Sequence, residues 1–271
     1  MFLSIVIPAF NEEKRLPKTL KKVRDYLNRQ NITRQGGGGQ AYEVIVVNDG
    51  STDNTPGVLS GLIRDWPEFR LIDNRKNCGK GAVVKQGMLA AKGEWRLFMD
   101  ADSSTDISEV QKLFGFADEN QNAKIKTCLP TGRMQNQNEK FKKQEKSEII
   151  IGSRYLNPDS IKIKQPVLRR IISRLGNILV RILLGIKAAD TQCGFKLFSK
   201  EAAEDIFPLQ TIERWGFDME ILAIAIKKGY RIKEVPVDWY DAGGSQVKKS
   251  ATWKTLKELW KIKRNLMRGN Y

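Results

Sequence analysis

The stretch Trp95-Arg-Leu-Phe-Met-Asp-Ala-Asp-Ser-Ser104 decides how this chain folds, because an apolar run ends abruptly in two carboxylates, Asp100 and Asp102. A short apolar run with polar residues after it is typical of a buried strand. Carboxylates at the carboxyl end of such a strand can hold a hard divalent cation, which can neutralise a diphosphate. An Asp-x-Asp pair can equally be a turn or a helix cap, so the interpretation needs support from other segments.

Two earlier apolar runs end in the same manner. Phe2–Pro8 is a short β-branched run that gives way to Ala9-Phe-Asn-Glu-Glu13, and a helical pattern follows. Tyr42–Val47 gives way to Asn48-Asp-Gly-Ser-Thr-Asp53, which also precedes a helical pattern. Alternation of strands with helices predicts an α/β fold with a Rossmann-type, mostly parallel central sheet flanked by helices. Several polar loops should then meet at one edge of that sheet.

A third polar loop, Asn77-Cys-Gly-Lys-Gly81, precedes another helical stretch. Its glycines would let backbone amides and Lys80 approach a phosphate. The spacing of a Walker A loop is missing, so the segment alone could equally be a helix-entry turn.

Composition narrows the classes of function. The 271 residues fit one domain, and 47 Lys and Arg against 31 Asp and Glu give a net charge of +16. This charge favours a polyanionic partner such as nucleic acid, an anionic membrane surface or phosphates. The absence of histidine leaves carboxylates to do any metal or acid-base work. Three widely spaced cysteines show no metal-ligand spacing, which indicates a reducing compartment without a disulfide framework.

The sequence shows no pattern of a membrane-spanning helix or of a signal peptide. No apolar stretch approaches the roughly 20 residues that span a bilayer, and Met1 leads into the first strand without a signal-peptide pattern. We therefore expect a cytoplasmic chain that is peripheral on the cytoplasmic face of a membrane. Gly36–Gly39 and Asp118–Glu148 have the composition of surface insertions. Neither has the periodicity of a separate domain, so residues 1–271 should form a single domain.

With these loops assembled, the chain resembles family 2 inverting glycosyltransferases of the GT-A fold. The resemblance is carried by four motifs in register, namely Ser4–Glu13, Val47–Asp53, Asn77–Gly81 and Asp100–Asp102. Further along, three motifs are similar to the dolichyl-phosphate β-glucosyltransferase branch, namely Ile151–Arg154, Asp190–Phe198 and Glu213–Asp218. The likeness covers nearly the whole chain. It departs at Asn48, where many relatives carry an aspartate, and in the two insertions.

The resemblance implies a UDP-sugar donor held by about the first 115 residues. The residues it places around the donor are Pro8, Ala9, Asn11, Glu12, Asp49, Lys80, Asp100 and Ala101. Asp49 is the strongest of these, because a carboxylate can accept a hydrogen bond from the uracil N3–H. It could instead cap the turn before the following helix. Asp100 and Asp102 would hold Mg²⁺ or Mn²⁺ on the diphosphate, with Asp102 as the direct ligand.

The resemblance also implies inverting transfer of a hexose, which is glucose in that branch, to dolichyl or polyprenyl phosphate. The acceptor would be bound by about residues 148–245. The residues placed near the acceptor phosphate are Arg154, Arg169, Arg170 and Ser173, since guanidinium grips phosphate oxygens in a forked geometry. Each arginine could equally be a solvated charge or a structural ion pair. Asp102, Arg154 and Asp218 form the predicted catalytic set.

Two alternative functions stay open at this point. A phosphate acceptor is already ionised and needs positioning more than a base, which agrees with a histidine-free chain. A hydroxyl acceptor would need a carboxylate base, for which Asp218 is the first candidate and Glu220 the second. A nucleic-acid-binding module would use the positive charge without catalysis, but no recognition-helix or RNA motif is present, so no nucleic-acid partner is expected.

Two segments have the pattern of basic amphipathic helices. Pro166–Ile186 carries an apolar stripe with its arginines largely off it, and residues 250–268 place Trp253 and Trp260 among many lysines and arginines. Such helices can lie in an anionic headgroup layer, where tryptophan is favoured. They can also pack on the domain, so peripheral contact with an anionic membrane surface is a hypothesis.

Overall fold

The computed structural model describes residues 1–30, 42–117, 148–161, 167–241 and 251–271. Within α6 and α9, which are introduced below, the side chains of residues 167–175 and 251–253 lie outside the description. Both predicted insertions also lie outside the described residues, apart from Glu148.

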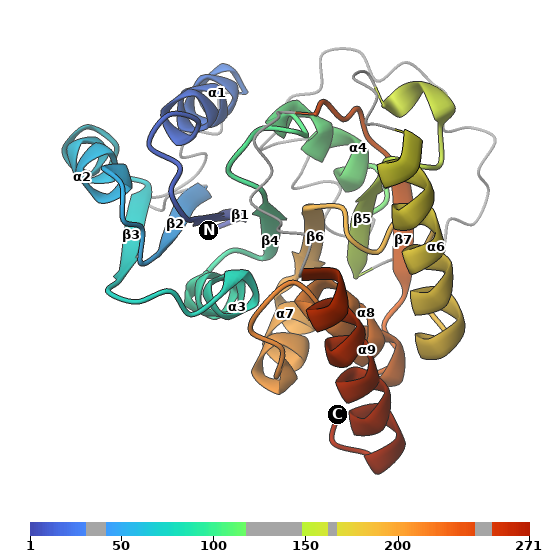
Figure 1. Ribbon diagram of the computed structural model, residues 1–271. Helices are drawn as coiled ribbons and strands as arrows, with labels where there is room; N and C mark the ends of the chain where they lie inside the picture. Colours follow the sequence, from blue (N-terminus) through green and yellow to red (C-terminus); the bar gives the residue numbers. More distant parts are fainter. Residues whose placement is uncertain (31–41, 118–147, 162–166, 242–250) are drawn as a thin grey trace.

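Seven strands of the described chain form one sheet, in the order β3-β2-β1-β4-β6-β5-β7 (Figure 1). Six of them run in one direction and β6 runs against its neighbours β4 and β5, which confirms a mostly parallel sheet. Their bounds are β1 Leu3–Ala9, β2 Tyr42–Asp49, β3 Phe69–Asn74, β4 Trp95–Met99, β5 Ile149–Ser153, β6 Phe195–Ser199 and β7 Ile232–Pro236.

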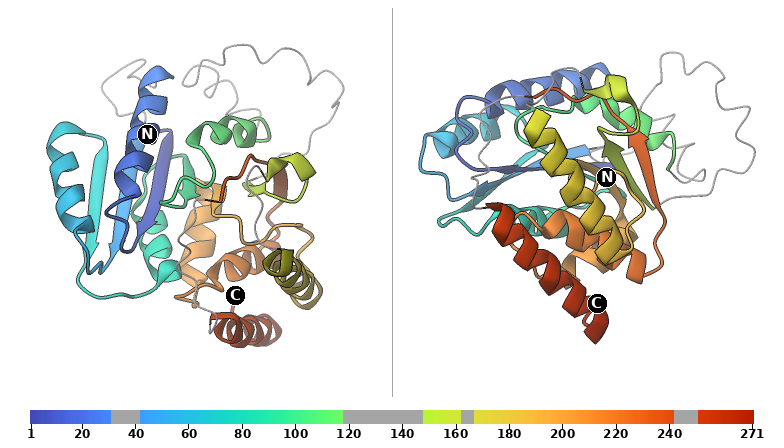
Figure 2. Two further views of the ribbon diagram at one scale, coloured as in Figure 1. Left: turned by 45° about the horizontal axis from the view of Figure 1, so that its top comes forward. Right: turned by 45° about the vertical axis from the view of Figure 1, so that its right-hand side comes forward.

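Helices cover both faces of this sheet. One face carries α1, α2 and α4, and the other carries α3, α7 and α8, with α6 and α9 packed further out along the same side (Figures 1 and 2). The bounds are α1 Leu16–Arg29, α2 Thr55–Asp65, α3 Lys80–Ala90, α4 Val110–Phe114, α6 Val167–Leu184, α7 Lys200–Ile206, α8 Phe217–Lys227 and α9 Ala251–Arg268. None of the helices in the described part of the chain is long and apolar enough to cross a bilayer.

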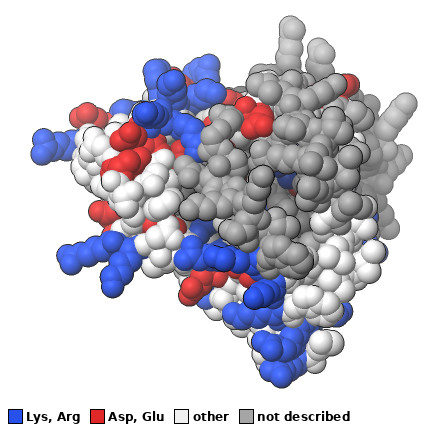
Figure 3. All heavy atoms as spheres, in the orientation of Figure 1, with Lys and Arg blue, Asp and Glu red and all other residues white. Residues whose placement is uncertain are grey.

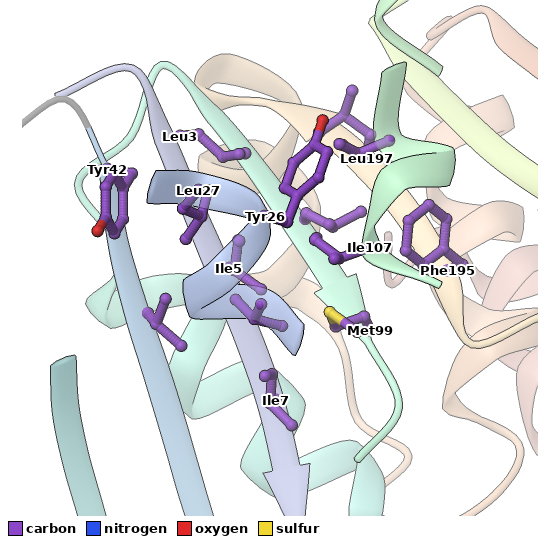
Figure 4. Packing of buried hydrophobic residues seen from close by; sticks show 14 of the residues in the cluster. Leu3, Ile5, Ile7, Tyr26, Leu27, Tyr42, Met99, Ile107, Phe195 and Leu197 are labelled. Atoms are coloured by element: carbon purple, nitrogen blue, oxygen red, sulfur yellow. The ribbon is translucent and has the colours of Figure 1, made fainter. Parts of the chain in front are cut away.

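The central strands are mostly apolar because both of their faces are buried. In β1, Leu3, Ile5 and Ile7 enter the core under α1, where they pack with Tyr26 (Figure 4). Val6 points to the opposite core, beneath α3 and α8. Burying one such side chain stabilises the fold by about 1.5–3 kcal/mol, so the alternation fixes which face each helix covers.

The reversed direction of β6 determines which loops lie at the carboxyl edge of the sheet. Since β4 and β6 are antiparallel, Met99 at the end of β4 pairs with Phe195 at the start of β6. The loop before β6 therefore lies at the carboxyl ends of β1, β2 and β4. The backbone N–H of Asp100 donates to the carbonyl of Gly194 at 3.0 Å. Motifs almost one hundred residues apart in sequence thus share one edge.

Candidate active site

The two carboxylates predicted from the sequence follow β4 directly, at the carboxyl edge of the sheet. Asp102 accepts a hydrogen bond at Oδ1 from the backbone N–H of Ser104, at 2.9 Å. The hydroxyl of Thr19 donates to the carbonyl of Ala101 at 2.6 Å and holds the turn between the carboxylates. Burial raises the pKa of Asp102, and the charge of Asp100 raises it further. The edge therefore concentrates negative charge that a bound cation would offset.

Lys80, the first residue of α3, reaches this carboxylate pair. Its Nζ lies 2.6 Å from Oδ1 of Asp100. The same Nζ lies 5.4 Å from the ring centroids of both Phe98 and Trp215, within cation–π range. Burial lowers the pKa of Lys80, but the charges of Asp100 and Asp218 outweigh burial and raise it above its ordinary value. Lys80 is therefore a fixed positive charge beside the predicted metal ligands.

The loop before β6 packs against Asp100 without a gap. A Cβ atom on Gly194 would lie 2.0 Å from Oδ2 of Asp100, so only glycine leaves the carboxylate in place. Cys193, the preceding residue, is buried, and burial raises the pKa of its thiol to about 12. The thiol stays protonated near neutral pH, so Cys193 is a packed residue and not a nucleophile.

Sequence reasoning missed Lys196, which lies in β6 and is fully buried. Its Nζ donates to Oδ1 of Asp218 and to the carbonyl of Cys193, each at 2.5 Å. Burial raises the pKa of Asp218, and the charges of Lys196 and Lys80 offset part of that rise. The available signal was a lysine within the apolar run Phe195–Phe198, since a buried ammonium needs a partner.

Arg154 directly follows β5 and forms a forked ion pair with Asp190. Its Nε lies 2.7 Å from Oδ2 and its terminal nitrogen 2.8 Å from Oδ1 of that carboxylate. The guanidinium also lies 5.3 Å from the Tyr155 ring and 5.5 Å from the Trp239 ring. Two of the guanidinium donors are therefore used in hydrogen bonds to Asp190. The contact of Arg154 with an acceptor phosphate stays a prediction.

The loops after β1 and β2 bond to each other. The N–H of Asn11 donates to Ser51 Oγ at 2.9 Å, and Asn11 Oδ1 accepts from the N–H of Thr52 at 2.8 Å. Asn11 has a φ of 55°, a left-handed conformation that asparagine tolerates better than most residues. The N–H of Glu12 donates to Thr55 Oγ1 at 2.8 Å. These bonds fix the predicted nucleoside-binding loops as one rigid unit.

Glu12 is paired with Arg15, another residue that the sequence reasoning did not single out. Nε of Arg15 lies 2.7 Å from Oε2 of Glu12. Burial raises the pKa of Glu12 while Arg15 lowers it, and the charges of Asp102 and Asp100 add to the rise. Arg15 therefore places a second cation near the carboxylate pair. The signal in the sequence was an arginine three residues after a glutamate at a helix start.

Asp49 holds the loop that leads to Lys80. Its carboxylate accepts from the backbone N–H groups of Cys78 at 2.6 Å and Gly79 at 3.1 Å, and from the side-chain amide of Asn77 at 3.0 Å. Asp49 therefore holds the loop that precedes α3. It does not cap α2, the helix that follows its own strand. Burial raises the pKa of Asp49 more than these hydrogen bonds lower it.

Pro8 and Ala9, the other two residues predicted near the donor, lie at the end of β1, where they pair with β2.

The other predicted acceptor residues, Arg169, Arg170 and Ser173, fall within α6. Their side chains lie outside the described part of the structure. Their contact with an acceptor phosphate therefore stays a prediction.

The donor atoms at the sheet edge suit a hard divalent cation. Asp100 and Asp102 present only oxygen, the ligand atom that Mg²⁺ prefers and that also suits Mn²⁺. Among the described residues, no group of three or more His, Cys, Asp or Glu could enclose an ion. At phosphate sites, oxygens of the phosphates and of water usually complete the coordination of Mg²⁺.

Solved structures show the same fold. Glucosyl-3-phosphoglycerate synthase from Mycobacterium tuberculosis, in complex with Mg²⁺ and uridine diphosphate, is similar with a TM-score of 0.60 at 15% identity. The match covers 96% of this chain and 77% of that chain. This likeness confirms the predicted fold, which is the α/β fold of GT-A glycosyltransferases.

The chain belongs to glycosyl transferase family 2, whose family model matches residues 4–207. It is 35% identical to dolichyl-phosphate beta-glucosyltransferase ALG5D of Trichomonas vaginalis over 97% of this chain and 73% of that protein. It is 34% identical to dolichyl-phosphate beta-glucosyltransferase of Saccharomyces cerevisiae over 91% of this chain and 69% of that protein. The resemblance found in the sequence motifs is thereby confirmed.

Proposed function

We propose that this chain transfers glucose from UDP-glucose to dolichyl phosphate, with inversion at the sugar C1 carbon. The observation that carries the proposal is its likeness, over nearly its whole length, to proteins named dolichyl-phosphate beta-glucosyltransferases. The charges at the sheet edge support the donor half. A single displacement by the acceptor phosphate would invert the configuration and would need no covalent intermediate on the protein.

The residues at the carboxyl edge of the sheet would have different roles in binding the donor. Asp100 and Asp102 would hold Mg²⁺ or Mn²⁺, which when bound neutralises charge developing on the departing diphosphate. Lys80 adds a fixed ammonium beside them, 5.4 Å from the centroids of two aromatic rings. Because these charges are in place before the reaction, they stabilise the leaving group without reorganisation.

The environment of Asp218 favours a phosphate acceptor over a hydroxyl acceptor. A phosphate oxygen is already a charged nucleophile and gives up no proton. A hydroxyl acceptor would need a free carboxylate, whereas Asp218 is buried and bonded to the ammonium of Lys196. Asp218 then serves to hold Lys196 and Lys80 in place.

Transfer of radiolabelled glucose from UDP-glucose to dolichyl phosphate in detergent, with and without Mg²⁺ or Mn²⁺, tests the proposal. Asp218→Asn keeps an oxygen that can accept from Lys196, so we expect transfer to fall by only about tenfold per folded molecule. Loss of a general base would lower the rate by about 10²–10⁴-fold. A loss in that upper range, or labelling of a hydroxyl acceptor but not of dolichyl phosphate, would favour the hydroxyl-acceptor function.

We also propose that α6 and α9 rest on an anionic membrane surface, on the cytoplasmic side. The two helices contact each other on one side of the molecule (Figure 2). Ile182 of α6 and Trp260 of α9 are exposed by 74% and 61%. Figure 3 shows lysine and arginine at the lower end of the molecule, where α9 lies, and the exposed basic residues of α9 are Lys254, Lys257, Lys261, Arg264 and Arg268. Exposed apolar side chains among positive charges suit an anionic headgroup layer.

Co-sedimentation with lipid vesicles tests this membrane contact. We expect binding to vesicles that contain phosphatidylserine and little binding to phosphatidylcholine alone, because each basic residue near the surface contributes about 1 kcal/mol. Ile182→Ser and Trp260→Ser should weaken binding, whereas Leu89→Ser, an exposed apolar residue of α3, should not. Equal binding by all three variants would contradict the assignment of this surface.

A further inference from the structure

The segment Gln210–Gly216 covers the start of α3 and carries Trp215 against Lys80. The backbone carbonyl of Glu213 accepts from the N–H of Ala82 at 3.0 Å. The ring of Trp215 lies over the ammonium of Lys80. The position of Lys80 beside the carboxylates therefore depends on what holds this segment, which we call the 210–216 segment.

A buried carboxylate on α8 anchors the beginning of the 210–216 segment. Oε2 of Glu220 accepts from the N–H groups of Thr211 at 2.9 Å and Ile212 at 2.7 Å. The hydroxyl of Tyr271, which follows α9, donates to Oε1 of Glu220 at 2.6 Å. Glu220 is fully buried, so these donors satisfy a charge that would otherwise be costly.

A carboxylate on α9 anchors the other end. Oε2 of Glu258 accepts from the backbone N–H of Gly216 at 2.8 Å. Gly216 directly follows Trp215 and stands at the start of α8, where a negative charge interacts favourably with the helix dipole. A Cβ atom on Gly216 would lie 2.8 Å from the same carboxylate oxygen, so the contact is tightly packed.

The sequence of α9 makes this glutamate unusual. Glu258 is the only acidic residue between Ala251 and Arg268, a helix that is otherwise basic and apolar. On a helix that rests on an anionic surface, a carboxylate weakens the attraction. The inward bond to Gly216 accounts for its presence.

We propose that Glu258 is a positioning residue for donor binding. Its hydrogen bond fixes the peptide that follows Trp215, and Trp215 in turn confines Lys80 beside Asp100. The proposal rests on the proposed binding of a UDP-sugar at this edge. Loss of the bond should weaken the donor's binding and leave the acceptor's binding unchanged.

The test compares Glu258→Ala with Glu258→Gln and with Ser199→Ala. Binding of UDP in the presence of Mg²⁺ is measured by calorimetry, and the KM values for UDP-glucose and dolichyl phosphate are measured separately. For Glu258→Ala we expect about tenfold weaker UDP binding and a similar rise in the KM for UDP-glucose, as for the loss of a hydrogen bond to a charged group. Glutamine keeps an accepting oxygen and should restore most of the affinity.

Ser199→Ala is the matched control, because it removes the side-chain cap of α7, a bond of Ser199 Oγ to the N–H of Ala202 at 3.2 Å. It should lower stability without changing UDP affinity. A purely structural role of Glu258 would lower the amount of active enzyme and leave both KM values unchanged, which would overturn the proposal.

Two further outcomes are decisive. If Glu258→Ala does not fold, Glu258→Asp takes its place, since the shorter side chain withdraws the carboxylate from Gly216. Unchanged UDP affinity in that variant would overturn the proposal as well. A wild-type chain that binds no UDP would instead overturn the proposed function itself, and the positioning role with it.

Discussion

Replacing Asp102 with alanine is expected to lower kcat/KM for glucose transfer by about 10³-fold, because several kcal/mol of charge stabilisation would be lost with the metal ligand. The variant should also lose most of its response to added Mg²⁺ or Mn²⁺. The measurement is transfer from UDP-glucose to dolichyl phosphate across a metal titration. Removing the metal from the wild-type enzyme with a chelator should bring its rate to about the same level.

Asp106→Ala is the control for this prediction. Asp106 is a nearby carboxylate whose side chain accepts from the N–H of Ser108 at 3.0 Å and caps a short 3₁₀ turn. Its removal should cost about 1 kcal/mol of stability and leave the metal response intact. If Asp102→Ala kept the wild-type rate and metal dependence, Asp102 would not be the metal ligand.

Local sequence patterns predicted the elements that depend on local chemistry. Each apolar run became a buried strand, since such runs are stable only when both faces are covered. Asp100 and Asp102 could be placed at the carboxyl edge because they follow such a run directly. Lys80 could be placed near them because its glycine-rich loop precedes a helix at the same edge.

Contacts that depend on strand order could not be predicted in this way. Nothing in the pattern of β6 shows that it runs antiparallel, yet that direction brings Gly194 onto Asp100 and places Lys196 beneath the site. The side-chain partners of Arg154 and Asp218 follow from the same reversal. Glu258 bonds to the 210–216 segment from a helix whose sequence indicates only a basic amphipathic pattern.

Replacing Asp190 with alanine should destabilise the fold by about 3 kcal/mol, because the partly buried guanidinium of Arg154 would lose its partner. Asp190 is 1% exposed and accepts a forked pair of bonds from Arg154. The measurement is chemical denaturation of the wild type and the variant. Glu148→Ala breaks the exposed Arg231–Glu148 pair, 3.3 Å apart, and should cost less than about 1 kcal/mol. A similar cost for both variants would contradict the prediction.

The pH dependence of this difference follows from the pKa of Asp190. Burial raises that pKa, but the charge and hydrogen bonds of Arg154 outweigh burial and hold it below its ordinary value of 3.8. The folded state then binds its proton at a lower pH than the unfolded state. The stabilisation by the ionised carboxylate is therefore fully present above the unfolded-state pKa and is lost as the pH falls through the folded-state pKa. The difference between wild type and Asp190→Ala should shrink over that acidic interval.

A double variant separates the structural role of Arg154 from its predicted contact with the acceptor. Arg154→Met together with Asp190→Ala removes both charges of the ion pair, so most of the lost stability should return. If Arg154 also binds the acceptor phosphate, the stable double variant should still show a raised KM for dolichyl phosphate and an unchanged KM for UDP-glucose. If both the stability and the KM for dolichyl phosphate recovered, the role of Arg154 would be structural only. It would hold together the loop after β5 and the loop before β6.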